Sequence, residues 1–180
     1  MLRTLLMCTL LLPAVAFARD WQVDAAASTL GFTGSYQGEA FTGRFKSFEA
    51  QIRYDAADLA TARFDVKVDL ASVDTTSSER DDTLKGSDFF AVAKFPSAHF
   101  VTSACSAGSD GSVTAQGQLT LRDHTRPVTL KVKFAADGDH ATLSVDTVLK
   151  RDEFGVGSGS DWDDISAEIP VHGQLKLSAR

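Results

Sequence analysis

The residues of this chain that could do chemistry do not fall into a catalytic motif. A nucleophile elbow requires the pattern Gly-x-Ser-x-Gly, but residues 155–159 read Gly-Val-Gly-Ser-Gly and place the serine one position too late. The same glycines are not a dinucleotide-binding fingerprint, because no βαβ pattern surrounds them. We therefore interpret this stretch as a loop. A triad assembled from residues far apart in the sequence stays open as an alternative.

Spacings typical of metal sites are also missing from the sequence. No histidine pair has the His-x-x-x-His or Glu-x-x-His arrangement of a zinc site. Carboxylates at positions 161, 163 and 164 surround Trp162, but their spacing is not that of an EF-hand. We expect a solvated acidic loop there and no bound metal. The histidines are His99, His124, His140 and His172.

Residues 1–18 have the pattern of a secretory signal peptide. They begin with a positive charge at Arg3, continue with an apolar run, and end in Ala16-Phe17-Ala18. The run is too short to span a bilayer. The pattern predicts removal of residues 1–18 and export, to the periplasm in a Gram-negative cell. Since Arg3 is the only charged residue removed, the formal charge would change from −6 to −7.

The remaining residues, 19–180, have the length of one domain with a sizeable core. They contain one cysteine, Cys105, so no internal disulfide is expected. We interpret Cys105 as an unreactive residue at a loop edge. The acidic charge and the lack of a basic stripe argue against nucleic acid as a partner.

Most of the chain alternates apolar and polar residues with a period of two. This pattern is typical of strands that bury one face. About eight or nine such segments, with turn signals at 109–111 and 137–139, predict an all-β fold. An antiparallel barrel that holds one ligand is favoured, and a two-sheet sandwich is the alternative. The segments cover residues 21–24, 29–34, 41–54, 64–70, 98–104, 113–121, 128–134, 143–149 and 169–177.

One segment, residues 72–96, interrupts this pattern. Thr76 and Glu79 have the spacing of a capping box, which predicts a short helical insert near residues 77–92. Three phenylalanines follow within seven residues, at 89, 90 and 95. A short helix that carries aromatic residues in an all-β chain indicates a lid or wall over an apolar interior.

Two pairs of oppositely charged residues are adjacent in the sequence. We expect Arg80 and Asp81 to pair and to hold the insert in place. Arg151 and Asp152 are expected to behave similarly. In the alternative, Arg151 points inward and contacts a phenol, quinone or phosphate oxygen of a ligand.

Phenylalanine is the dominant aromatic residue, with twelve copies against two tyrosines and two tryptophans. Many of these rings must pack the core of a barrel. The surplus also suits a tunnel for a long apolar ligand, since burial of apolar surface yields about 25 cal/mol per Å² without any polar anchor.

The chain resembles the YceI-like family, also called polyisoprenoid-binding or lipid-binding periplasmic proteins. The resemblance spans nearly all of residues 20–178. It rests on motifs that occur in the family order: Trp21-x-x-Asp24 with Ser28 and Phe32, Gly43-x-Phe45 with Phe48, Ser72-Val73-Asp74-Thr75, Arg80-Asp81-x-x-Leu84-Lys85-x-x-Asp88-Phe89-Phe90, Phe95-Pro96, Gly117-x-Leu119-Thr120-Leu121-Arg122-Asp123, and Arg151-x-x-Phe154-Gly155.

The resemblance implies a lipocalin-like, extended antiparallel β-barrel of about eight strands over residues 19–180, with an elongated apolar tunnel. It implies binding of an isoprenoid chain, such as a quinone precursor or polyprenyl lipid, or of another long-chain amphiphile, without catalysis or cofactor. Geometry and resemblance together predict the tunnel wall. Its expected residues are Phe32, Phe45, Phe48, Leu84, Phe89, Phe90, Phe100, Arg151, Phe154 and Val156.

The leading hypothesis is therefore a periplasmic carrier of isoprenoid lipid. Transient contact with a membrane or a membrane protein is expected for such a carrier, and both a monomer and a homodimer stay open. Two alternatives remain: a secreted hydrolase of lipid-like esters, with a Ser or Cys105 as nucleophile, and an envelope stress or interaction module without ligand.

Overall fold

Ten strands account for most of residues 19–180, the part of the chain that the computed structural model describes. The predicted signal peptide lies outside these residues. The strands are β1 (Arg19–Tyr36), β2 (Glu39–Phe45), β3 (Phe48–Tyr54), β4 (Arg63–Asp69), β5 (Val73–Asp74), β6 (Ser97–Ala107), β7 (Val113–Leu121), β8 (His124–Asp137), β9 (His140–Lys150) and β10 (Glu168–Ala179). The helices are α1 (Ser78–Lys85) and the 3₁₀ turns η1 (Leu59–Thr61), η2 (Leu70–Ser72), η3 (Arg151–Phe154) and η4 (Ser160–Trp162).

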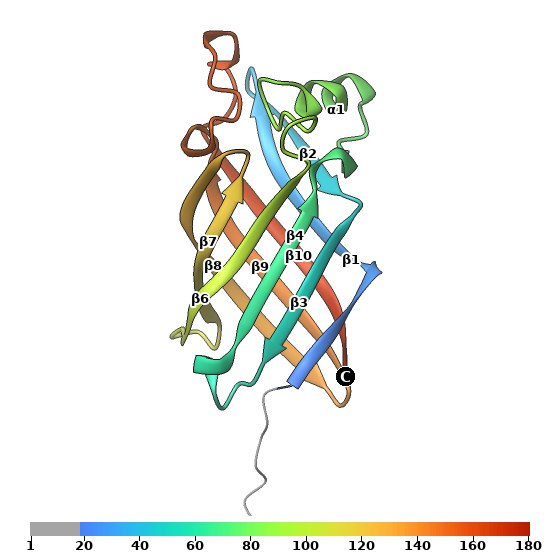
Figure 1. Ribbon diagram of the computed structural model, residues 1–180, viewed down its shortest axis with the longest axis vertical. Helices are drawn as coiled ribbons and strands as arrows, with labels where there is room; N and C mark the ends of the chain where they lie inside the picture. Colours follow the sequence, from blue (N-terminus) through green and yellow to red (C-terminus); the bar gives the residue numbers. More distant parts are fainter. Residues whose placement is uncertain (1–18) are drawn as a thin grey trace, which may run out of the picture.

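Eight of these strands close into an antiparallel barrel (Figure 1). Around the wall the order is β1-β3-β4-β6-β7-β8-β9-β10, and pairing of β10 with β1 closes the ring. Full closure leaves no sheet edge on this ring, which an open sandwich would have. The all-β barrel predicted from the alternating pattern is confirmed, and the sandwich alternative is wrong.

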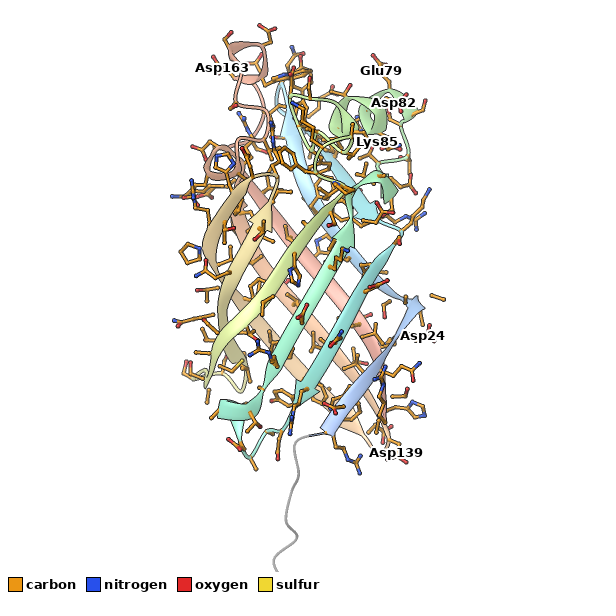
Figure 2. All side chains as sticks on the ribbon, in the orientation of Figure 1. Asp24, Glu79, Asp82, Lys85, Asp139 and Asp163 are labelled. Atoms are coloured by element: carbon orange, nitrogen blue, oxygen red, sulfur yellow. The ribbon has the colours of Figure 1, made fainter. Side chains whose placement is uncertain are left out.

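Strand β1 is long enough to pair with different neighbours at its two ends. Its first residues pair with β3, whereas 31–36 pair with β2. Between these parts an irregularity from Asp24 to Thr29 interrupts the pairing with β10. The carboxylate of Asp24, on the outside of the barrel in Figure 2, accepts hydrogen bonds from the amides of Ala26 and Ala27 at 3.0 and 3.1 Å. The bulge lets one strand serve both halves of the wall.

A matching bend separates β2 from β3 and β4 from β5. The amide of Lys46 donates to the carbonyl of Ser72, and the amide of Asp69 donates to the carbonyl of Ser47, both at 3.1 Å. These hydrogen bonds bridge the bend, so β2–β3 and β4–β5 each behave as one bent strand. The wall therefore continues beyond the ring toward the helical end.

The helical insert forms where the sequence predicts it, but its cap differs. The residue that caps α1 is Ser77, whose Oγ accepts from the amide of Arg80 at 3.4 Å. The predicted cap, Thr76, is wrong because its backbone adopts a left-handed φ of 62°. The carboxylate of Asp81 explains this turn, since it accepts from both the amide and the hydroxyl of Thr75, at 2.8 and 2.7 Å. After Lys85 the insert continues as turns.

The expected charge pair within the insert is also wrong. Asp81 is engaged by Thr75, as described, and the guanidinium of Arg80 instead stacks 4.6 Å from the ring centre of Phe41 on β2. Neighbouring positions on a helix point in different directions, so two consecutive residues rarely face each other.

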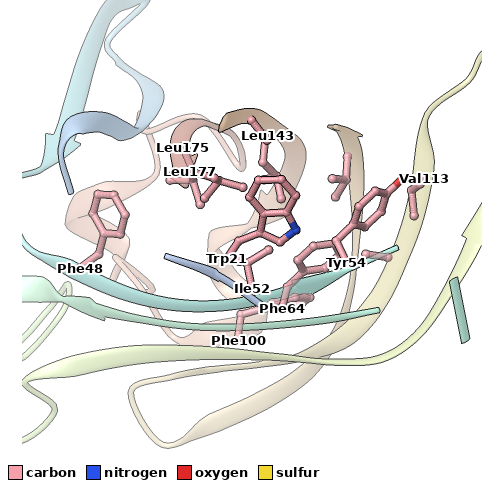
Figure 3. Close-up of a cluster of buried hydrophobic side chains, with 13 residues drawn as sticks. Trp21, Phe48, Ile52, Tyr54, Phe64, Phe100, Val113, Leu143, Leu175 and Leu177 are labelled. Atoms are coloured by element: carbon pink, nitrogen blue, oxygen red, sulfur yellow. The ribbon is translucent and has the colours of Figure 1, made fainter. Parts of the chain in front are cut away.

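The end of the barrel opposite α1 is filled by aromatic side chains (Figure 3). The ring of Phe134 stacks on Tyr54 at 4.2 Å and meets the edge of Trp21 at 5.1 Å. Ile52 and Phe64 pack in the same cluster, each 3% exposed. A second apolar cluster lies under α1 and includes Phe32, Leu84, Phe90 and Phe154. The interior is therefore sealed at one end and covered at the other.

The junction of β2 and β5 makes a prediction about acid titration. Arg44 donates from Nε and Nη2 to Asp74 at 3.1 and 2.9 Å, and Lys46 lies 3.1 Å from the same carboxylate. Hydrogen bonding from Arg44, followed by that from Lys46, lowers the pKa of Asp74 from 3.8 to about 2. A depressed pKa means that this pairing stabilises the fold above pH 3.8 and that the contribution is lost as the pH falls through about 2.

We expect a carboxyl NMR titration to place the pKa of Asp74 near 2, and Arg44→Ala to return it toward 3.8. An unchanged pKa in the Arg44→Ala variant would show that Arg44 is not the cause.

Candidate functional site

The barrel encloses an apolar cavity of about 560 Å³ between the sealed end and the helical cover. Small-molecule sites usually measure about 300–1,000 Å³ and are mostly apolar with few polar groups. The cavity wall consists of inward side chains of the strands, and its polar residues lie mainly on α1 and near Arg151. The space therefore has the character of a ligand site with one apolar end and one polar end.

Two long strands show how the alternating sequence builds this wall. On β9, Leu143, Val145 and Leu149 line the cavity, and on β10 their cross-strand partners Leu175, Gly173 and Ile169 do so. The side chains of a strand alternate between its two faces, so every second residue points inward. From Leu143 to Leu149 the wall runs for about 20 Å along the strand, at about 3.3 Å per residue. The cavity is thus elongated along the strands.

Aromatic rings of the wall lie against glycines of the adjacent strand. Phe32 pairs with Gly43, where an added Cβ would come within 2.4 Å of its ring. Phe100 packs in the same way on Gly117, at 2.5 Å from such a Cβ. A larger residue at either glycine would push the ring away from the wall and into the interior. The glycines therefore keep these rings flat and the cavity open.

All ten residues predicted for the tunnel wall border this cavity. They are Phe32, Phe45, Phe48, Leu84, Phe89, Phe90, Phe100, Arg151, Phe154 and Val156. Phe89 and Phe90, at 4% and 8% exposed, also belong to the apolar cluster under α1. They are thus core and cavity wall at once, and their contact with a ligand stays a prediction.

Several side chains that line the cavity at the helical end are not predicted by the sequence patterns. Trp162 lines the cavity, donates from Nε1 to Asp88 at 3.1 Å and meets the edge of Phe89 at 4.8 Å. The residue lies in the loop that was expected to be merely solvated. No local signal could have revealed its role, because Asp88 is 74 positions away. Tyr36, Phe41 and Ile165 also line this end.

The predicted charge pair between Arg151 and Asp152 is wrong, because Arg151 instead binds backbone carbonyls of the loop over the cavity. Its guanidinium donates to backbone carbonyls with Nε, Nη1 and Nη2, including that of Trp162 at 3.0 Å and that of Ser166 at 3.2 Å. The other accepting carbonyls belong to Val156, Gly157 and Ile165. Its five N–H groups are matched by five carbonyls. The alternative in which Arg151 points to a ligand oxygen is therefore not supported, although its side chain borders the cavity.

Arg122 has a related role at the neighbouring turn. Its Nη1 donates to the carbonyls of Phe89 and Gly155, at 2.8 and 2.5 Å. This ties the insert after α1 to the turn after η3. Loops that leave the sheet have carbonyls without ladder partners, and the two arginines satisfy them.

Cys105 and the histidines are candidate residues for a catalytic site, and they do not pair with each other within residues 19–180. Cys105 lies on β6 against the aromatic cluster, and burial raises the pKa of its thiol, which disfavours the reactive thiolate. Where histidines make side-chain contacts within residues 19–180, their partners are carboxylates: Asp65 for His99 and Asp123 for His124. Within the same residues, no side-chain hydrogen bond joins a histidine to a serine or to Cys105.

Two further properties hold for the described residues. Between positions 19 and 180, no group of three or more His, Cys, Asp or Glu is arranged to hold a metal ion. None of the helices in that range is long and apolar enough to cross a membrane.

Arg151→Met should destabilise the protein by about 2–4 kcal/mol, because it leaves several partly buried carbonyls without donors. Urea denaturation would measure the loss, and hydrogen exchange should increase in residues 155–166. Arg53→Met is the matched control, since Arg53 is exposed on β3. Equal stability of the two variants would contradict the structural role of Arg151.

Comparison with known sequences agrees with this architecture. The model of the YceI-like domain matches residues 21–177. A UPF0312 protein of Shewanella denitrificans is 35% identical over 141 residues, which cover 77% of this chain and 74% of the relative. A UPF0312 protein of Vibrio vulnificus is 33% identical over 129 residues, covering 70% and 68%.

Solved structures share the barrel. BcnA of Burkholderia cenocepacia superimposes with a TM-score of 0.82 at 29% identity, covering 86% of this chain and 99% of that protein. A polyisoprenoid binding domain from Saccharophagus degradans has a TM-score of 0.71 at 20% identity, covering 91% and 100%, and shares the fold. With the family match over residues 21–177, these findings show that the chain belongs to the YceI-like domain family.

Proposed function

We propose that this protein binds a long-chain isoprenoid lipid, or a similar amphiphile, inside its barrel and does so without catalysis. The observation that carries the proposal is the elongated cavity of about 560 Å³, whose wall is almost entirely apolar. An apolar chain fits such a wall, whereas a sugar or nucleotide would leave many polar groups unpaired.

The energetics favour a long chain over a short one. Each buried CH₂ group contributes about 0.8 kcal/mol, so a chain of roughly fifteen carbons contributes about 12 kcal/mol before the costs of association. These costs amount to about 4–15 kcal/mol, and a short chain would not offset them. The sealed aromatic end at Trp21, Tyr54 and Phe134 limits the length that fits.

A structural neighbour supports the isoprenoid as the ligand class. The Saccharophagus degradans protein that shares the fold is a polyisoprenoid binding domain. We extend this chemistry to the present chain because its wall combines flat aromatic rings with branched aliphatic residues. Periplasmic location and lipid transport are part of the proposal, and the location rests on the sequence pattern of residues 1–18.

The two alternative functions have less support. An ester hydrolase would need a nucleophile beside a base, and within residues 19–180 no side-chain hydrogen bond joins a histidine to a serine or to Cys105. A module that binds no ligand would be expected to have a collapsed interior, whereas this barrel contains a cavity.

A matched pair of substitutions on β9 tests the proposal. Val145 points into the cavity, and Val148 lies on the outer face, 55% exposed. Val145→Trp should fill the lumen and lower retention of an added prenyl lipid at least tenfold, while Val148→Trp should leave retention unchanged. Retention is measured by gel filtration followed by mass spectrometry of the extracted lipid. Equal retention by both variants would place the ligand outside the barrel.

A further inference from the structure

Three arginines lie at the helical end of the cavity, and their guanidinium groups have different partners. Arg122 and Arg151 donate to backbone carbonyls of the covering loops. Arg80 also borders the cavity, but no hydrogen bond or ion pair between residues 19 and 180 engages its guanidinium. Of the two arginines that line the cavity, Arg80 is therefore the one whose N–H groups have no acceptor within residues 19–180.

The position of Arg80 is nonetheless fixed. Its backbone amide binds the Oγ of Ser77 at the start of α1, and its guanidinium lies 4.6 Å from the ring centre of Phe41. Stacking on an aromatic ring occupies one face of the guanidinium plane and leaves the N–H groups along its edge free. Phe41 is itself held by the edge of Phe32, at 6.4 Å. The cation is thus held in place beside the cavity.

Arg80 is half-buried as a residue, and its guanidinium has no acceptor from the protein within residues 19–180. A ligand that enters the cavity would remove water from this guanidinium, which is costly unless the ligand supplies an acceptor. Polar lining residues around it come from the same helix, Ser77, Glu79 and Thr83. The hydroxyl of Thr83 donates to the carbonyl of Glu79 at 2.9 Å, so it is committed to the helix. The acceptor for Arg80 can therefore come from the ligand.

We propose that Arg80 binds the oxygen-bearing head group of the lipid in the cavity, and that this head group is a single carboxylate or carbonyl. This inference rests on the proposed function. An arginine can donate two parallel hydrogen bonds to one carboxylate, which gives a strong and oriented contact. The apolar chain then extends from Arg80 toward the aromatic cluster at the sealed end.

The hydrogen-bond donors at this end suit a head group with one or two acceptor oxygens. Glu79 lines the cavity next to Arg80, and Asp82 and Asp163 lie at the same end of the barrel (Figure 2). Lys85 is also at this end but is not part of the cavity wall. Arg151 keeps its positive charge, but backbone carbonyls occupy its N–H groups. A diphosphate has more acceptor oxygens than the guanidinium of Arg80 can match, whereas the two oxygens of one carboxylate are matched.

Three ligands with the same C15 chain test this proposal: farnesoic acid, farnesol and farnesyl diphosphate. Their binding to the full chain is followed by tryptophan fluorescence, to which Trp162 in the cavity wall contributes together with Trp21. We expect the unaltered protein to bind the acid at least tenfold more tightly than the alcohol or the diphosphate. Arg80→Gln should bring the acid to the affinity of the alcohol and leave the affinity for the alcohol unchanged.

Two further variants complete the experiment. Arg53→Gln, an exposed position on the outside of β3, should keep the preference for the acid. Arg80→Lys keeps the charge but cannot form two parallel hydrogen bonds, so it should reduce the preference at least threefold. This second variant decides the question if Arg80→Gln does not fold.

The outcomes separate this inference from the proposed function. Binding of all three ligands with an acid preference that Arg80→Gln and Arg80→Lys leave intact would overturn the role of Arg80 and keep the lipid site. Tightest binding of the diphosphate would overturn the head-group class. Binding of none of the ligands by the unaltered protein would overturn the proposed function itself.

Discussion

The packing of aromatic rings on wall glycines is the constraint on which this structure depends. An eight-stranded barrel has an interior that side chains alone can fill. Eleven of the phenylalanines lie in residues 19–180, which is ample to fill it. Phe32 on Gly43 and Phe100 on Gly117 lie along the wall instead of across the lumen. The space that they leave is the cavity, and with it the proposed function.

The two ends of the barrel are closed by different kinds of interaction. At the sealed end, Trp21, Tyr54 and Phe134 pack ring against ring and need few polar contacts. At the helical end the chain leaves the sheet, so its carbonyls lose their ladder partners. Arg122 and Arg151 supply donors to these carbonyls and join loops that are distant in sequence. The resulting cover has a polar inner edge, while the rest of the cavity stays apolar.

The sequence predicted the barrel and its wall because both follow from a period-two pattern and from family motifs. Val145 on β9 points inward as this pattern requires. Features that depend on tertiary contacts were not predicted. Asp81 binds Thr75 and moves the helix cap from Thr76 to Ser77. No pattern in the sequence could indicate this choice between adjacent hydroxyl residues.

The same limit applies to the charged residues of the site. An arginine near an aspartate suggests an ion pair, but Arg151 binds carbonyls, which every residue has and no sequence pattern marks. The contact of Trp162 with Asp88 joins segments 74 positions apart. Inward apolar positions of the barrel strands were therefore largely predictable from the sequence, whereas the loop residues Trp162 and Ile165 and the partners of polar groups required the fold.

Native mass spectrometry of the protein purified without delipidation tests the central claim most directly. The account predicts one bound molecule per chain, with a mass that matches a single long-chain lipid and a fragmentation pattern of an apolar chain. Recovery of ligand-free protein alone, with no uptake of added prenyl lipid, would contradict it.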